Sequence, residues 1–135
     1  MANMTGLVGL MRPRRFLWLG GTVLVAVGLA GLLGGLAPLS SASVFNPPYW
    51  INWVHLVLGV VVLTIAMVSS HTAHTAMTLA AALLGTPLGL AGLLLGPYAA
   101  TRYSMPELAD PSEHLAHLSV GVLAVWAWLN RAVGT

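Results

Sequence analysis

The sequence predicts an all-α integral membrane protein, a four-helix bundle built from two helical hairpins, and three observations support this prediction. Of its 135 residues, 58% are hydrophobic and only 6% are charged, whereas about a quarter of the residues in an ordinary soluble domain are charged. Four long apolar stretches are separated by more polar ones, and a helix needs roughly 20 residues to cross a bilayer. Four of the five arginines flank the first and last apolar stretches. We therefore predict a single transmembrane domain over residues 1–135.

The first two predicted helices form the first hairpin. The first spans residues 16–37, follows the basic segment "RPRR" and contains no charged side chain. This stretch is too long for a signal peptide, whose apolar core has about 7–15 residues. The second spans residues 47–69. Asn46 can cap it, and Pro47 suits a first helical turn because its missing N–H group would have no partner there.

The third and fourth predicted helices form the second hairpin. The third spans residues 76–98, and Pro87 is expected to kink it by removing a backbone hydrogen bond. The polar segment "SSHTAHTA" before it is predicted to be a turn, with His71 and His74 solvated or at the level of the lipid headgroups. The fourth helix spans residues 111–131 and begins at "DPSE", a capping-box pattern.

The placement of arginine predicts the orientation in the membrane. Arg12, Arg14, Arg15 and Arg131 lie on one side of a four-helix arrangement, and only Arg102 lies on the other. Because cytoplasmic flanks are enriched in Lys and Arg, both termini are predicted to be cytoplasmic, with the protein in the inner (plasma) membrane. We therefore interpret the excess of arginine over acidic residues as an indication of membrane topology. It is not interpreted as a nucleic-acid-binding surface, so nucleic acid is not a predicted partner. The chain has no cysteine, which excludes disulfides and thiolate chemistry.

Two short segments resemble each other. "NWVHLVLGV" and "EHLAHLSVGV", aligned on His55 and His117, share the following leucine and also Gly59 with Gly121. Both segments open helices that enter the membrane from the outer side, as in a parallel repeat of two hairpins. Glycine permits close packing in lipid, and imidazole there requires a partner. We therefore expect the second and fourth helices to pack against each other, with the two histidines at similar depth near the outer side.

These segments also resemble a known family. With "NPPYWINWVHLVLGVVVL" and "DPSEHLAHLSVGVL", the chain is similar to a bacterial family of four-helix membrane proteins catalogued as domain of unknown function 4383. The resemblance implies a fold and a topology, but no activity. The family pairs an "N-x-x-H-L-x-x-G" segment opening its second helix with a similar segment opening its fourth. Asn52, His55, Leu56 and Gly59 match the first segment, His117, Leu118 and Gly121 match the second, and His114 stands where the family has asparagine.

The histidines allow several interpretations. Each imidazole could simply donate to a carbonyl or polar side chain and hold the bundle together. His55, His114 and His117 could instead bind a divalent metal such as zinc. His55 and His117 could also clamp a haem or a chlorophyll-type pigment, with Gly59 and Gly121 leaving room for the macrocycle. A proton or solute relay is a further alternative.

The function that this sequence favours is a non-enzymatic one. No combination of nucleophile, base and acid is evident, and the middle of each apolar stretch lacks ionisable groups. We therefore expect a small accessory or scaffold subunit that acts within the membrane, with the lipid bilayer and other membrane subunits as partners and no cofactor. The alternative is a membrane protein that binds haem, pigment or metal through the paired histidines.

Overall fold

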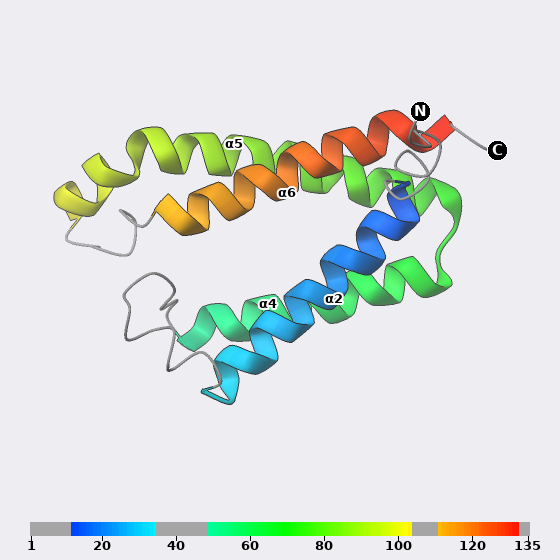
Figure 1. Ribbon diagram of the computed structural model, residues 1–135, viewed down its shortest axis with the longest axis horizontal. Helices are drawn as coiled ribbons and strands as arrows, with labels where there is room; N and C mark the ends of the chain where they lie inside the picture. The colour runs from blue at the N-terminus through cyan, green and yellow to red at the C-terminus, as the bar shows by residue number, and fades with distance from the viewer. Residues whose placement is uncertain (1–11, 35–48, 104–110, 133–135) are drawn as a thin grey trace, which may run out of the picture.

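The computed structural model describes residues 12–34, 49–103 and 111–132, and this part of the chain is helical (Figure 1). The prediction of an all-α protein is confirmed for these residues. The residues expected to cap the second and fourth helices, Asn46 and Asp110, lie outside the described ranges. The elements are α2 (Pro13–Leu32), α4 (Tyr49–Val68), α5 (His71–Tyr103), α6 (Pro111–Leu129) and the 3-10 helix η2 (Asn130–Ala132).

The third helix differs most from its prediction. The expected turn at "SSHTAHTA" is shorter, because α5 already begins at His71. Ser70 caps this helix, since its hydroxyl accepts a hydrogen bond of 3.3 Å from the Ala73 amide. Both Pro87 and Pro97 lie within the 33 residues of α5. The helix is therefore about 50 Å long, which exceeds the roughly 30 Å of a hydrocarbon core.

Three of the described helices are long and apolar enough to cross a membrane. They are α2, α4 from Trp50 onward, and α5, and their large apolar side chains are widely exposed, as Leu94 and Val68 are at 77% each. Lipid is the environment that favours such a surface. The first two turns of α6 carry Glu113, His114 and His117, and α6 is not among these three helices. Three described helices with the length and composition of membrane spans thus support a membrane protein.

The four helices form two antiparallel hairpins, and this pairing corrects one prediction. α2 packs along α4, and α5 packs along α6 (Figure 1). The second and fourth helices, α4 and α6, were expected to pack against each other, but each packs mainly on its own hairpin partner. The reason is that the glycines of α4 and α6 face inward within their hairpins, where they permit backbone contact.

The glycine contacts show how closely each pair of helices approaches. A Cβ atom added at Gly59 in α4 would lie 2.7 Å from the Val25 amide nitrogen of α2. A Cβ atom at Gly85 in α5 would lie 3.0 Å from the Gly121 nitrogen of α6. In both hairpins the neighbouring atom belongs to the backbone, which cannot move aside as a side-chain tip can. Glycine is therefore required at these contacts by the spacing of the helices.

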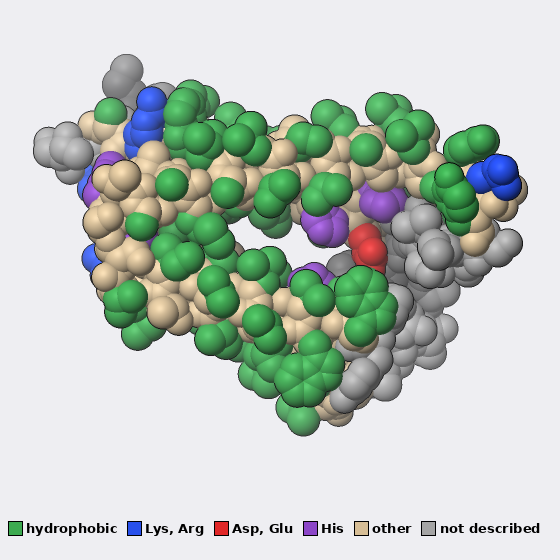
Figure 2. Space-filling model, turned by 180° about the vertical axis from the view of Figure 1, so that it is seen from behind, with side chains coloured by type: hydrophobic (Ala, Val, Ile, Leu, Met, Phe, Trp, Pro, Cys, Tyr) green, Lys and Arg blue, Asp and Glu red, His purple; other side chains and the backbone are tan. Residues whose placement is uncertain are grey.

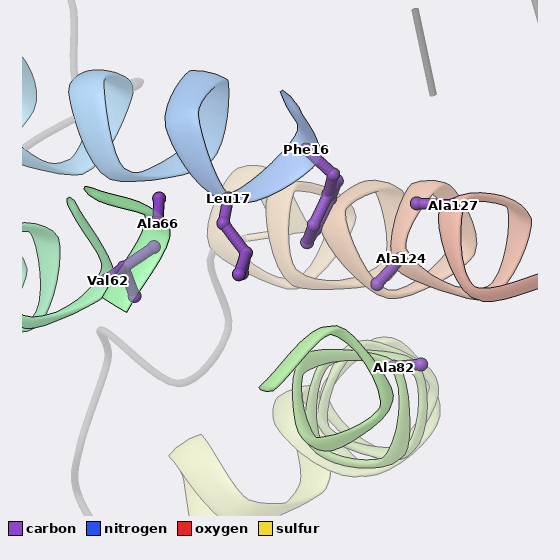
Figure 3. Close-up of a cluster of buried hydrophobic side chains, with 7 residues drawn as sticks. All are labelled: Phe16, Leu17, Val62, Ala66, Ala82, Ala124 and Ala127. Atoms are coloured by element: carbon purple, nitrogen blue, oxygen red, sulfur yellow. The ribbon is translucent and has the colours of Figure 1, made fainter. Parts of the chain in front are cut away.

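The two hairpins meet at one end of the molecule, which we call the joined end. The start of α2, the end of α4, the start of α5 and the end of α6 lie there, and the hairpins diverge toward the opposite, splayed end (Figure 1). Phe16 and Leu17 of α2 point into the space between the other three helices (Figure 3). Small side chains surround them and allow all four helices to converge. The buried cluster consists of Phe16, Leu17, Val62, Ala66, Ala82, Ala124 and Ala127.

Candidate functional site: the inter-hairpin histidines

The buried cluster fixes the positions of the two histidines that the sequence singled out. His55 lies seven residues before Val62 on α4, and His117 lies seven residues before Ala124 on α6. Seven residues are close to two helical turns, so each histidine shares a helix face with the cluster residue below it. Val62 and Ala124 belong to the cluster at which the hairpins meet, so each histidine projects from the cluster side of its helix, about 10 Å above the cluster.

The space between the hairpins at this level is open in the space-filling view. Figure 2 shows histidine side chains on both sides of the gap between the two hairpins, with an acidic side chain beside them. His55 lies within electrostatic range of both His117 and Glu113. We call this space, bounded by α4 on one side and α6 on the other, the inter-hairpin opening. The opening brings His55 and His117 to face each other although their helices are not packed together.

The hydrogen bond of His117 determines which of its nitrogens is available. Nδ1 of His117 lies 2.8 Å from the backbone oxygen of Glu113, one turn earlier on α6. A carbonyl oxygen only accepts, so Nδ1 carries the proton and donates it. In the neutral ring, Nε2 then retains its lone pair. The side chain is exposed, and His117 can therefore act as an acceptor or as a metal ligand.

His55 and Asn52 carry polar atoms that lack partners among the described residues. Nδ1 of His55 and Oδ1 of Asn52 are both buried without a hydrogen bond. Asn52 is only 5% exposed, and its amide packs against Gly31 of α2. An unsatisfied buried polar group costs about 1–3 kcal/mol. The first turns of α4 thus contain two unpartnered polar groups, of which Asn52 faces α2 within its own hairpin.

His114 does not join the pair. Its imidazole lies against Gly92 of α5, where a Cβ atom would overlap the ring. His55, His114 and His117 were considered together as zinc ligands. The described residues contain no group of three or more His, Cys, Asp or Glu side chains that could hold a metal ion. The structure therefore places two of these histidines at the opening and the third within a hairpin.

The two glycines assigned to the site also lie elsewhere. Gly59 faces Val25 of α2, and Gly121 faces Thr86 of α5. Neither glycine borders the opening, so the room between the histidines does not come from the missing side chains, as the sequence suggested. It comes from the divergence of the hairpins above the buried cluster. The stripe of small residues in each helix belongs to the contact within its hairpin.

The joined end contains a polar arrangement that sequence reasoning missed. His74 is buried at 6% exposure, and its Nε2 lies 3.0 Å from the Ile65 carbonyl oxygen near the end of α4. Nε of Arg14 donates to the neighbouring Ala66 oxygen at 3.1 Å. These side chains satisfy carbonyls in the last turn of α4. The prediction that His71 and His74 are both solvated is thus wrong for His74, while His71 is exposed.

The two hairpins make corresponding contacts at corresponding positions. The sequence offset between His55 and His117 also relates three other pairs of residues on α4 and α6, namely Asn52 with His114, Leu56 with Leu118, and Gly59 with Gly121. The residues that these pairs contact on α2 and α5 are likewise related to each other by one constant sequence offset. The partner residues are Gly31, Gly28 and Val25 in the first hairpin and Gly92, Gly89 and Thr86 in the second.

Comparison of the chain with protein-family models, with curated proteins and with solved structures finds no match. The resemblance to the four-helix family noted from the sequence therefore stays a prediction.

Proposed function

We propose that the chain is a small, non-enzymatic membrane protein that works as an accessory component and holds another molecule in its inter-hairpin opening. The observation that carries this proposal is that histidine side chains line both sides of that opening (Figure 2), and that His55 of α4 lies within electrostatic range of His117 of α6. Imidazole within a membrane is costly unless it finds a partner, and His55 has a buried nitrogen without one among the described residues. A bound molecule that contacts both hairpins would supply that partner.

The chemistry around the opening suits binding. Two imidazoles and the Glu113 carboxyl group lie at or near it, and apolar helix faces surround them. Such a combination can hold a ligand or a partner segment by a few directed contacts within an apolar space. The exposed apolar surface outside the opening would contact lipid or other membrane subunits.

We further propose that the two hairpins are halves of a parallel repeat. The matching contacts of Gly59 and Gly121, and of Gly28 and Gly89, support this interpretation. In membrane proteins built from repeats, binding sites tend to lie at the interface between the repeats. The histidine pair occupies that position here, with one member from each half.

The proposal includes four membrane crossings and cytoplasmic termini, which thiol labelling can test in a chain without cysteine. Thr72 and Thr101 are exposed residues near opposite ends of α5. In intact cells, a membrane-impermeant maleimide should label Thr101→Cys and should label Thr72→Cys only after permeabilisation. The arginine distribution is the reason for this expectation. Labelling of Thr72→Cys alone in intact cells would invert the proposed orientation.

Occupation of the opening can be tested by comparing two sites on α6. Val120 follows His117 by one turn of α6 and is 48% exposed, whereas Ser119 is an exposed residue about 200° around the helix from His117. We expect the thiol of Val120→Cys, a variant that keeps both histidines, to react at least 10-fold more slowly in native membranes than in detergent-purified protein. A bound molecule would shield it in the first case and be removed in the second.

Ser119→Cys is the matched control, because it lies on the same helix at nearly the same depth. Dividing the Val120→Cys rate by the Ser119→Cys rate corrects for the difference between bilayer and micelle. If this ratio is the same in membranes and in detergent, nothing occupies the opening and the proposed function fails.

A further inference from the structure

We propose that the molecule held in the inter-hairpin opening is a metal-bearing tetrapyrrole of the haem type, with His55 and His117 as its two axial ligands. This inference rests on the proposed function and specifies the ligand class of that same site. Three properties of the described residues support it: the state of the His117 ring, the unpartnered nitrogen of His55, and the number of possible ligands.

The His117 ring has the hydrogen bonding of a metal ligand. Histidines that bind metals almost always donate their other ring N–H to a carboxylate, a carbonyl or water, which fixes the tautomer and the ring orientation. The 2.8 Å bond from Nδ1 to the Glu113 oxygen has this form. It leaves the lone pair of Nε2 available on an exposed side chain.

His55 supplies the second ligand from the other hairpin. Its ring is partly buried, and because its Nδ1 is buried without a hydrogen-bond partner among the described residues, Nε2 would be the nitrogen that binds the metal. His55 and His117 lie two turns above Val62 and Ala124 of the buried cluster, and the two side chains lie within electrostatic range of each other. Two imidazoles that approach from opposite sides suit the axial positions of a metal whose remaining ligands lie in one plane.

The number of ligands distinguishes a tetrapyrrole from a bare metal ion. Zinc sites usually need three or four protein ligands, and the described residues form no group of three or more candidates. His114, the nearest further histidine in sequence, lies against Gly92. A macrocycle brings four nitrogen ligands of its own and requires only axial ones from the protein. Two histidines are then sufficient.

The walls of the opening match the apolar body of a macrocycle. Leu58 and Val120 each lie one turn below a histidine, on the side facing the buried cluster. They are 43% and 48% exposed, so each offers apolar surface that a ligand could cover. A flat, apolar ring between α4 and α6 would cover both side chains. It would also provide the contact between the hairpins that the splayed end lacks among the described residues.

The test uses the full-length protein purified in detergent and titrated with hemin. We expect one equivalent to bind and to give the spectrum of six-coordinate, low-spin iron with two imidazole ligands. His55→Ala and His117→Ala should each abolish this low-spin spectrum and weaken hemin binding at least 10-fold. Added imidazole should restore the low-spin spectrum in both variants, which distinguishes loss of a ligand from loss of folding.

His71→Ala is the control, because His71 is exposed at the joined end and should bind hemin like the wild type. High-spin hemin that is insensitive to both substitutions indicates partition into the micelle and overturns the proposal. Loss of low-spin iron in only one variant also overturns it, as does stoichiometric retention of Zn²⁺ alone that depends on both histidines. Shielding of the Val120→Cys thiol without any tetrapyrrole binding would refute this inference while leaving the proposed function standing.

Discussion

Replacing Gly121 with alanine is expected to lower the free energy of unfolding by about 1–3 kcal/mol, the usual cost of overpacking. The added methyl group would meet the backbone nitrogen and hydroxyl of Thr86 and the carbonyl carbon of Gly85. Rotation of a side chain cannot relieve a clash with the backbone, so α5 and α6 would have to separate. Separation would weaken the close packing on which helix association in lipid depends. Denaturant titration of purified protein, followed by circular dichroism, measures the effect.

Gly20 provides the matched control for this prediction. It also lies within a membrane helix, but a Cβ atom there would have no neighbour within 4 Å. Alanine is intrinsically better than glycine in a helix by up to about 1 kcal/mol. Gly20→Ala should therefore leave stability unchanged or raise it slightly. Equal stability of the Gly121→Ala and Gly20→Ala variants would show that α5 and α6 are further apart than in this structure.

Replacing Leu17 with alanine is expected to have the largest effect on the joining of the hairpins, with a loss of about 2–5 kcal/mol. Leu17 is 2% exposed and is the largest apolar side chain among those that are almost fully buried. Figure 3 shows it pointing from α2 toward the other helices of the cluster. Its removal would leave a cavity where the two hairpins meet. Because the neighbours are mostly alanines, they cannot fill this space by changing rotamer.

Leu19 on the same helix is the matched control, since it is 56% exposed. Leu19→Ala removes the same atoms from a surface that faces lipid, and stability should change by less than about 0.5 kcal/mol. Fluorophores attached near the ends of the two hairpins should report increased separation in Leu17→Ala alone. If both leucine variants unfold at the same denaturant concentration, the buried cluster does not hold the hairpins together.

The contacts within each hairpin show how far sequence reasoning could go. The spacing of Gly59 and Gly121 correctly predicted close helix contacts, because a glycine stripe in an apolar helix has few other uses. It did not identify the partner helix. Gly28 and Gly89 lie on the first helix of each hairpin and offer equally suitable surfaces. A stripe of small residues on one helix can pack against such a stripe on any other helix. The sequence pattern alone therefore does not determine which helices pair.

The candidate site was predicted only in part, again because the sequence pattern does not determine which neighbour each side chain contacts. The sequence identified His55 and His117 as equivalent positions, and the helical period placed each of them on a definite face. It grouped His114 with them because residues three apart on a helix are neighbours. The structure instead turns the His114 ring toward Gly92. It also buries His74 against the Ile65 carbonyl, a contact that depends on where α4 ends and α5 begins.

Composition and local spacing determined that this chain is helical, that most of it belongs in a membrane, and that two of its segments correspond. These properties follow from residues near one another in the sequence, because helix formation and transfer into lipid are decided over about 20 residues. Only the tertiary structure decided that the hairpins join at one end and diverge at the other. That arrangement depends on where side chains from four separate helices are small enough to converge. The same divergence leaves an opening with histidine side chains on both sides, where His55 lies within electrostatic range of His117, instead of a packed interface.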